Sequence, residues 1–395
     1  MNSARILSGP QAVLPLLRIW VRILFITWKQ TNSLSRFFQT ASALVRERKK
    51  LVHSKMIHKI IKVDGKYFWN MNAPAWPSLA FDRFFEFTAS QLRDGIKFNA
   101  ERVRLVLLLI TKKCPLNCEH CFEWDEINKK ETLSLDQLIR IVKKYQSLGA
   151  SHFLLGGGEP LVRFNELLEI VKTGHQLSDF WISTSAYHLT IEKAKKLKEV
   201  GLRGVSISLD HYQEEMHNAF RGHSDSYRNV IAGIKNAQRA GLAVALSACT
   251  TRTFTTRENL MKYAELARKM NVGFIQLLEP RAVGRYAGKD VQLLPEHYQV
   301  LDQFYLELNH QKRYRNFPLI IHTSYNQRRF GCDAAGLNNL TIDTDGYINA
   351  CPFCRSKTKH ALDEHAALAS KTIQQEGCHK FDGRASENTT KESVF

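Results

Sequence analysis

Three of the eight cysteines in this 395-residue chain fall within one short stretch, LLLITKKCPLNCEHCFEW. Cys114, Cys118 and Cys121 are separated by three and two residues, so a single loop can present three thiolates to one face of a cubane iron–sulfur cluster. Such clusters normally take four cysteines, and three leave one iron with an open coordination position, which is typical of a catalytic metal site. The trio therefore predicts a catalytic [4Fe–4S] cluster. We prefer it to a zinc site, which would show paired CxxC spacing, and to a bacterial ferredoxin, whose spacing differs.

The CxxxCxxC spacing, placed directly after a predicted strand, resembles the signature of the radical S-adenosylmethionine (SAM) superfamily. The resemblance implies that the open iron binds the amino and carboxylate groups of SAM, and that an electron from the cluster cleaves SAM to a 5′-deoxyadenosyl radical. It covers roughly residues 102–286. It implies SAM contacts for one residue of the cysteine stretch and for residues at or after the ends of later strands. These are His120, Gly157, Gly158, Glu159, Ser208, Arg221 and Leu277.

Elementary chemistry is consistent with several of these assignments. Glycines in the GGGEP turn let the backbone approach a ligand, and the carboxylate of Glu159 can accept hydrogen bonds from an ammonium group. Residues 183–185 match a hydroxyl-rich stretch near the SAM ribose only loosely. Asp210 could bind a ligand, but we favour a role as a helix cap.

A second group of cysteines, Cys332, Cys351, Cys354 and Cys378, follows near the carboxyl end. Four thiolates suffice for one closed cluster. The spacing around Gly346 and Cys351 resembles the SPASM or twitch extension of radical SAM enzymes, although a full SPASM domain would have about three more cysteines. We expect one auxiliary [4Fe–4S] cluster, with a structural zinc ribbon as the alternative. The remaining Cys249 lies in a predicted strand and is expected to be a small buried side chain.

The elements that must position these residues alternate regularly along the chain. Short apolar runs predict six strands, at residues 104–110, 151–155, 180–184, 204–209, 243–248 and 273–278. Amphipathic stretches between them predict helices at residues 134–148, 165–173, 191–200, 227–240 and 257–270. This alternation predicts a parallel α/β sheet, doubly wound or a partial barrel, with ligands at the carboxyl ends of its strands. The family resemblance implies a partial (β/α)6 TIM-like barrel.

The composition divides the chain into five segments. We expect a basic helical extension over residues 1–62, a lead-in segment over 63–101 with a hairpin at Asp64-Gly65, and the barrel over 102–310. A small cluster-binding module over residues 311–380, with a tight turn at Asp345-Gly346, and a disordered polar tail over 381–395 complete the division.

Most of the net charge of +18 lies in the amino-terminal extension, where residues 1–62 hold twelve Lys or Arg and a single acid, Glu47. The apolar run over residues 13–28 is interrupted by Pro15, Arg18 and Arg22 and is shorter than the ~20 residues of a bilayer span. Its basic residues fall near one helical face, which favours an interfacial helix on the cytoplasmic leaflet, with a core helix of the fold as the alternative. We expect a cytoplasmic protein, peripheral on the inner face of the membrane, and no nucleic-acid partner.

Together these features predict a radical SAM enzyme that receives electrons from a low-potential donor such as flavodoxin or ferredoxin. Relatives with such extensions suggest a peptide or protein side chain as substrate. A membrane-associated small molecule or lipid is the rival, and a non-catalytic iron–sulfur electron carrier is the alternative from another class.

Overall fold

A computed structural model of the chain describes residues 4–31, 33–51, 59–93, 103–332, 339–366, 369, 372 and 373. Nine of its strands form one sheet in the order β10-β9-β8-β7-β6-β5-β4-β11-β12. Their bounds are β4 (Leu105–Leu109), β5 (His152–Gly156), β6 (Asp179–Thr184), β7 (Gly204–Ser208), β8 (Ala243–Cys249), β9 (Phe274–Leu278), β10 (Leu319–Ile321), β11 (Asn339–Ile342) and β12 (Ile348–Asn349).

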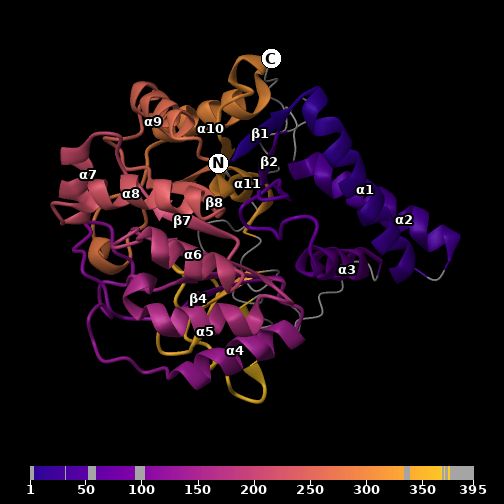
Figure 1. Ribbon diagram of the computed structural model, residues 1–395, viewed down its shortest axis with the longest axis horizontal. Coiled ribbons are helices and arrows are strands. Elements are labelled where there is room, and N and C mark those ends of the chain that lie inside the picture. The colour runs from indigo at the N-terminus through magenta and orange to yellow at the C-terminus, as the bar shows by residue number, and fades with distance from the viewer. Residues whose placement is uncertain are drawn as a thin grey trace.

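The six central strands, β4 to β9, are the six that the apolar runs predict, and all of them pair in parallel. Helices connect them and follow one another around the sheet, from α4 at the bottom of Figure 1 to α9 at the top. Burial on both faces explains the continuous apolar runs, and every residue of β8 is buried. The predicted partial barrel is therefore confirmed. Its connecting helices are α4 (Leu135–Ser147), α5 (Phe164–Gly174), α6 (Ile191–Glu199), α7 (Glu214–Arg221), α8 (Ser226–Arg239) and α9 (Arg257–Lys269).

Strands that follow β9 in the sequence extend this parallel core at both edges. Strand β10 extends the sheet beyond β9, and β11 pairs in parallel with β4, the strand that leads into the cysteine loop. Strand β12 then closes a short antiparallel hairpin through the predicted turn at Asp345-Gly346. The division at residue 310 stays a prediction, but part of the chain beyond it belongs to the same sheet. The other helices of the barrel and its flanks are α10 (Pro295–His310), α11 (Thr323–Phe330) and the short helices η1 (Pro160–Arg163), η2 (Gly284–Tyr286) and η3 (Lys312–Tyr314).

The amino-terminal extension folds onto one side of the barrel (Figure 1). An antiparallel sheet of β1 (Arg5–Ser8), β2 (Lys59–Val63) and β3 (Lys66–Phe68) contains the predicted hairpin, with Asp64 and Gly65 both at positive φ. Lys59 anchors this sheet, because its buried ammonium group donates to the carbonyls of Leu308 and Phe317 at 2.6 and 3.2 Å. The helices are α1 (Pro10–Gln30), α2 (Leu34–Leu51) and α3 (Leu79–Arg93).

Helix α1 has 21 residues and is longer than the apolar run that predicts it. Among the described residues it is the one helix long and apolar enough to cross a membrane, judged by length and composition. One of its faces packs through Ile19, Ile23 and Ile26 against other parts of the amino-terminal segment, chiefly α3. The guanidinium of Arg22, whose side chain is 41% exposed, donates to Asp82 of α3 at 2.9 and 2.5 Å, so its charge is paired within the protein.

Candidate active site

The loop that carries Cys114, Cys118 and Cys121 follows β4 and lies directly against the GGGEP turn. The amide of Gly158 donates to the carbonyl of Thr111 at 2.7 Å, and the amide of Glu159 donates to the carbonyl of Lys113 at 2.8 Å. A Cβ atom on Gly158 would lie 2.7 Å from the carbonyl carbon of Lys113 and closer still to its oxygen. The glycine is therefore required by the close approach of two backbones.

The carboxyl end of α7 forms a second wall of the loop. The amides of Asn117 and Glu119 donate to the carbonyls of Arg221 and Phe220 at 3.1 and 2.9 Å. Gly222 ends the helix at a φ of +61°, and a Cβ there would lie 2.5 Å from the carbonyl oxygen of Asn117. Because α7 is fixed against the cysteine loop in this way, the side chain of Arg221 points toward the thiol of Cys118.

A third wall comes from the segment after β9. Arg285 donates to the carbonyl and side-chain oxygens of Asn117 at 2.7 and 2.8 Å and to the carbonyl of Cys118 at 3.2 Å. Its own amide donates to the carbonyl of Cys121 at 3.0 Å, and its guanidinium lies over the ring of Trp124 at 4.4 Å. One arginine thus binds the loop at two of its three cysteines.

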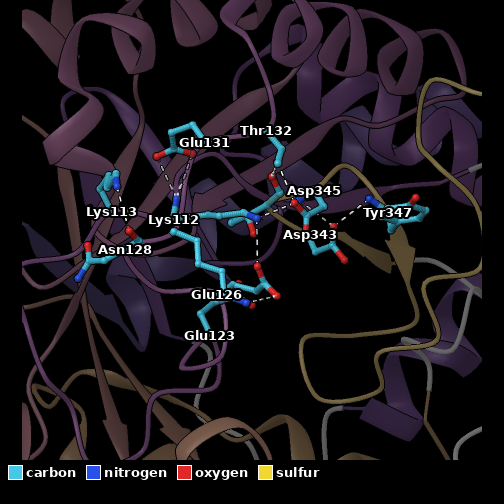
Figure 2. Close-up of polar contacts among 12 residues, drawn as sticks. Lys112, Lys113, Glu123, Glu126, Asn128, Glu131, Thr132, Asp343, Asp345 and Tyr347 are labelled. Carbon is cyan, nitrogen blue, oxygen red and sulfur yellow. Dashed lines mark hydrogen bonds and ion pairs between the residues drawn. The ribbon is translucent and has the colours of Figure 1, made fainter.

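A network of polar side chains joins the start of the loop to the C-terminal hairpin (Figure 2). The buried ammonium group of Lys112 lies 2.6 Å from Asp345 and 3.0 Å from Glu126. The side chain of Asn128 holds Cys114 through two hydrogen bonds of 3.1 Å: its oxygen accepts from the Cys114 amide, and its nitrogen donates to the Cys114 carbonyl. The hairpin of β11 and β12 is therefore tied to the cysteine loop, although the two lie far apart in the sequence.

The donor set and its surroundings fit an iron–sulfur cluster. Burial raises the pKa of the Cys114 thiol to about 12 and that of the Cys121 thiol to about 12, so a bound metal must displace their protons. Within the described ranges, no three His, Cys, Asp or Glu side chains gather closely enough to hold one metal ion. In a cubane each thiolate binds its own iron, so cluster ligands stand further apart than the ligands of a single ion.

The SAM contacts implied by the family resemblance fall into two groups. Gly157 and Gly158 touch the cysteine loop, and the ring of His120 stacks on Phe220 with centroids 4.7 Å apart. Burial lowers the pKa of His120 to about 4, and its Nδ1 has no partner, as a ligand-facing atom would. Ser208 is the last residue of β7, and Leu277 lies buried near the end of β9. The ends of parallel strands share one edge, so these two face the same side as the cysteines.

The carboxylate of Glu159 is bound by four groups of the chain itself. It accepts hydrogen bonds from the amide of Leu161 at 3.0 Å, the hydroxyl of Thr184 at 2.6 Å, and the amide and hydroxyl of Ser185 at 2.7 and 2.5 Å. The hydroxyl-rich stretch after β6 therefore contacts Glu159 directly. This arrangement fixes the GGGEP turn to the end of the neighbouring strand.

The preferred role of Asp210 as a helix cap is wrong. Gln213, not Asp210, precedes the first residue of α7. The carboxylate of Asp210 is buried, and it accepts a hydrogen bond of 2.6 Å from Arg221 and one of 2.9 Å from the amide of Cys249. Arg221 in turn directs Nη1 toward the thiol of Cys118 at 3.7 Å. Cys249 itself is buried, as expected.

The second cysteine group lies beside the first. Cys354 pairs with Cys351 in a tight turn. The hydrogen bond between their side chains lowers the pKa of Cys351, although burial and, to a smaller extent, the nearby Cys332 act to raise it. The side-chain amide of Gln327 donates to the sulfur of Cys332 at 3.5 Å. Three of the four predicted ligands are thus neighbours, and Cys378 lies outside the described residues.

Two aromatic rings and an ion pair connect the two cysteine groups. The rings of Phe122 and Phe353 meet edge to face with centroids 6.1 Å apart. Arg355 donates to the carbonyl of Phe122 at 2.7 Å and forms an ion pair with the buried Glu123. Burial raises the pKa of Glu123 to about 7, against the opposing charge of Arg355.

A buried charge network beyond β9 was missed by the sequence analysis. Glu279 accepts from Arg328 and from His322 at 3.2 Å, and Arg328 also binds Asp302. Although burial acts to raise it, the His322 hydrogen bond and the arginine charges lower the pKa of Glu279 to about 2. The signal that could have found this network is the acidic residue directly after the last predicted strand.

Comparison with known proteins identifies the barrel. Residues 108–270 match the family model described as Radical SAM superfamily. A protein named GTP 3',8-cyclase from Sulfurimonas denitrificans is 26% identical over 214 residues, which cover 50% of this chain and 64% of that protein. GTP 3',8-cyclase 2 from Pseudomonas aeruginosa is 30% identical over 181 residues, covering 44% of this chain and 54% of that protein. These alignments thus span less than two thirds of each relative.

Solved structures share the fold. The crystal structure of Streptococcus suis SuiB bound to the precursor peptide SuiA superimposes with a TM-score of 0.57 at 14% identity, and covers 78% of this chain and 72% of that one. The match to the family model begins within β4, includes the cysteine loop and the GGGEP turn, and ends after α9. Residues 108–270 therefore form a domain of the radical SAM superfamily.

Proposed function

We propose that Cys114, Cys118 and Cys121 bind a [4Fe–4S] cluster at which the chain cleaves SAM reductively in order to modify a substrate. The observation that carries this proposal is the rigid support of the cysteine loop. Backbone contacts from Gly158, from the end of α7 and from Arg285 hold the loop on three sides. Such support is what a catalytic metal site needs, because its ligands must keep their geometry while one position stays open.

The chain's own residues would orient SAM beside this loop. The backbone at Gly157 and Gly158 lies close enough to the loop to bound a pocket for the amino acid end of SAM. The neutral ring of His120 offers its unpaired Nδ1, and Leu277 offers an apolar surface for the adenine. When bound, the cluster supplies the electron that cleaves the sulfonium to a 5′-deoxyadenosyl radical.

The test is reductive cleavage of SAM by the full chain, reconstituted without oxygen. The wild type is expected to form 5′-deoxyadenosine with dithionite as reductant, and a C114A/C118A/C121A variant is expected to form none. A protein that holds its cluster but yields no 5′-deoxyadenosine would instead be the electron carrier named above, and the enzymatic proposal would be wrong.

An auxiliary [4Fe–4S] cluster at Cys332, Cys351 and Cys354, with Cys378 as the fourth ligand, is the second part of the proposal. The nearness of the three described cysteines supports it. About eight iron atoms per chain are expected with two clusters and about four with one. One equivalent of zinc with about four iron atoms would identify the zinc ribbon instead.

The assay of 5′-deoxyadenosine formation can also compare two classes of substrate, nucleotides and peptides. The curated relatives are named for GTP, and the SuiB structure contains a precursor peptide. The resemblance to relatives with similar cluster-binding extensions favours a peptide or protein side chain. A true substrate should increase 5′-deoxyadenosine formation and appear as a modified product. GTP and peptides from the source cells are therefore tested in parallel, with flavodoxin or ferredoxin as the electron donor.

We also propose that α1 and α2 lie on an anionic membrane surface. Along one stripe of α1, Val13, Leu17, Val21, Phe25 and Trp28 are 44–61% exposed, opposite the face that packs on the protein. Leu34 and Phe38 of α2 are each 63% exposed. Large exposed apolar patches mark interaction sites, and the excess of Lys and Arg over residues 1–62 complements anionic lipid.

Vesicle sedimentation tests this placement. The wild type is expected to bind vesicles that contain phosphatidylserine more tightly than neutral vesicles, and L17E/V21E should reduce binding at least tenfold. L177E/M216E, which places two such charges at exposed apolar side chains outside α1 and α2, is the matched control. Equal binding by wild type and L17E/V21E would refute the proposal, and concentration-dependent dimers would assign the apolar face to a second copy of the chain.

A further inference from the structure

Arg221 and Asp210 form a buried ion pair that ends on a cysteine of the cluster loop. Arg221 Nε lies 2.6 Å from Asp210 Oδ2, and Arg221 Nη1 lies 3.7 Å from the sulfur of Cys118. Asp210 and Arg221 are only 5% and 8% exposed. The guanidinium therefore stands between a carboxylate on one side and a predicted cluster ligand on the other.

The orientation of this pair is fixed from both ends. Asp210 accepts a second hydrogen bond from the amide of Cys249, and its own amide donates to His217 Nδ1 at 3.1 Å. The other nitrogen of His217 lies 3.0 Å from the hydroxyl of Ser226. The carbonyl of Arg221 is held by the amide of Asn117. The guanidinium therefore cannot turn away from Cys118 without breaking several buried contacts.

Each member of the pair carries its full charge. Burial acts to raise the pKa of Asp210, but the charge of Arg221, the two neighbouring histidines and the hydrogen bond from the amide of Cys249 together hold this pKa below its usual value. Burial lowers the pKa of His217 to about 4, so this ring is neutral near pH 7. The charges that face Cys118 here are thus one cation in front and one anion behind it.

A pair of this kind acts on the reduction of a cluster. Reduction adds one negative charge, which a nearby cation stabilises and a nearby anion destabilises. The charge of the surroundings and the hydrogen bonds to the ligand sulfurs set the potentials of iron–sulfur clusters. Since Arg221 is nearer to the sulfur than Asp210, the cation dominates, and the carboxylate reduces its effect.

We propose that Arg221 raises the reduction potential of the cluster bound through Cys118, and that Asp210 limits this increase. This inference rests on the proposed cluster. It gives Arg221 a function at the metal ligand itself, whereas the family resemblance assigns it to SAM. It also predicts that removing Arg221 alone and removing Asp210 alone shift the reduction potential in opposite directions.

The test is a redox titration of the full chain, reconstituted without oxygen and followed by electron paramagnetic resonance in the absence of SAM. Arg221→Met is expected to lower the equilibrium constant for one-electron reduction at least tenfold, which corresponds to about 59 mV. Asp210→Asn is expected to raise it by a similar factor. The double variant, which buries no unpaired charge, should return toward the wild type, and Arg221→Lys should keep part of the effect.

Arg203→Met is the matched control, because Arg203 also pairs with a buried carboxylate, that of Asp179 at the opposite end of the strands. It should leave the potential unchanged. Shifts of the same sign in R221M and D210N, or none in either, would overturn the inference. Should R221M fail to take up a cluster, D210N and R221K still decide it. A wild type without any cluster would instead refute the proposed function.

Discussion

Replacement of Gly158 by alanine should dislodge the cysteine loop while leaving the rest of the barrel folded. The added Cβ would lie 2.7 Å from the carbonyl carbon of Lys113 and 3.1 Å from Cys114 Cβ, whereas ordinary contacts begin at 3.4 Å. Both neighbours are backbone or the base of a side chain, so neither can swing aside. The loop must therefore retreat by about 1 Å, because atoms at such distances repel steeply.

Two magnitudes follow from this displacement. Overpacking of a close contact costs about 1–3 kcal/mol in the free energy of unfolding. A misplacement of about 1 Å in a catalytic site costs on the order of 100-fold in rate. We therefore expect G158A to fold with a lower melting temperature, to retain much less iron after reconstitution, and to form 5′-deoxyadenosine on the order of 100-fold more slowly.

Gly156 provides the control two positions earlier in the same turn. A Cβ there would meet Leu109 at 3.4 Å, which is an ordinary contact, so G156A should retain iron like the wild type. Iron content and thermal unfolding of the three proteins, measured side by side, decide the matter. If G158A binds as much iron as G156A, the close approach of the two backbones is not what holds the loop.

Three further predictions concern the scaffold. Arg328→Met should lower the free energy of unfolding by about 1.5–3 kcal/mol in urea titrations, because it removes a charged hydrogen bond from the buried Glu279, which among the described residues keeps only Arg281 at 3.7 Å as a cationic neighbour. Ser134→Ala, which removes a capping box at α4, should lower it by only about 1 kcal/mol and leave the iron content unchanged. Burial lowers the pKa of Lys59 to about 7 from its usual 10.5, so the unfolded chain binds more protons between these values and stability rises with pH there. Lys59→Met should remove this rise, at most about 1.4 kcal/mol per pH unit, as seen by comparing urea midpoints at pH 7 and pH 9.

The sequence predicted the central strands because their apolar runs are long enough to be recognised. Each of β4 to β9 has five to seven residues, most of them buried. Strands β10 and β11 have only three and four residues, and they join the sheet through neighbours far away in the sequence. A short strand whose partner is distant leaves no local pattern, so the extension of the sheet at both flanks could not be predicted.

At the candidate site the same contrast holds between local and distant contacts. The cysteine loop was predictable because its spacing is local. Asp210 was assigned wrongly, since its true partner Arg221 lies on the far end of the next helix. Arg285 was not singled out among 56 Lys and Arg, because its bonds are to backbone carbonyls that the sequence does not mark.

Because β11 pairs with β4, the cysteine loop is fully supported only at a late stage of synthesis of this part of the chain. Strand β4 and its cysteines leave the ribosome early, but the neighbour on the other side of β4 arrives only when residues 339–342 have been synthesised. Until then one edge of β4 is open, and Lys112 lacks its partner Asp345. The cysteine loop thus gains its full support only after β11 has been synthesised, so a nascent chain that has not reached β11 holds the cluster ligands less firmly.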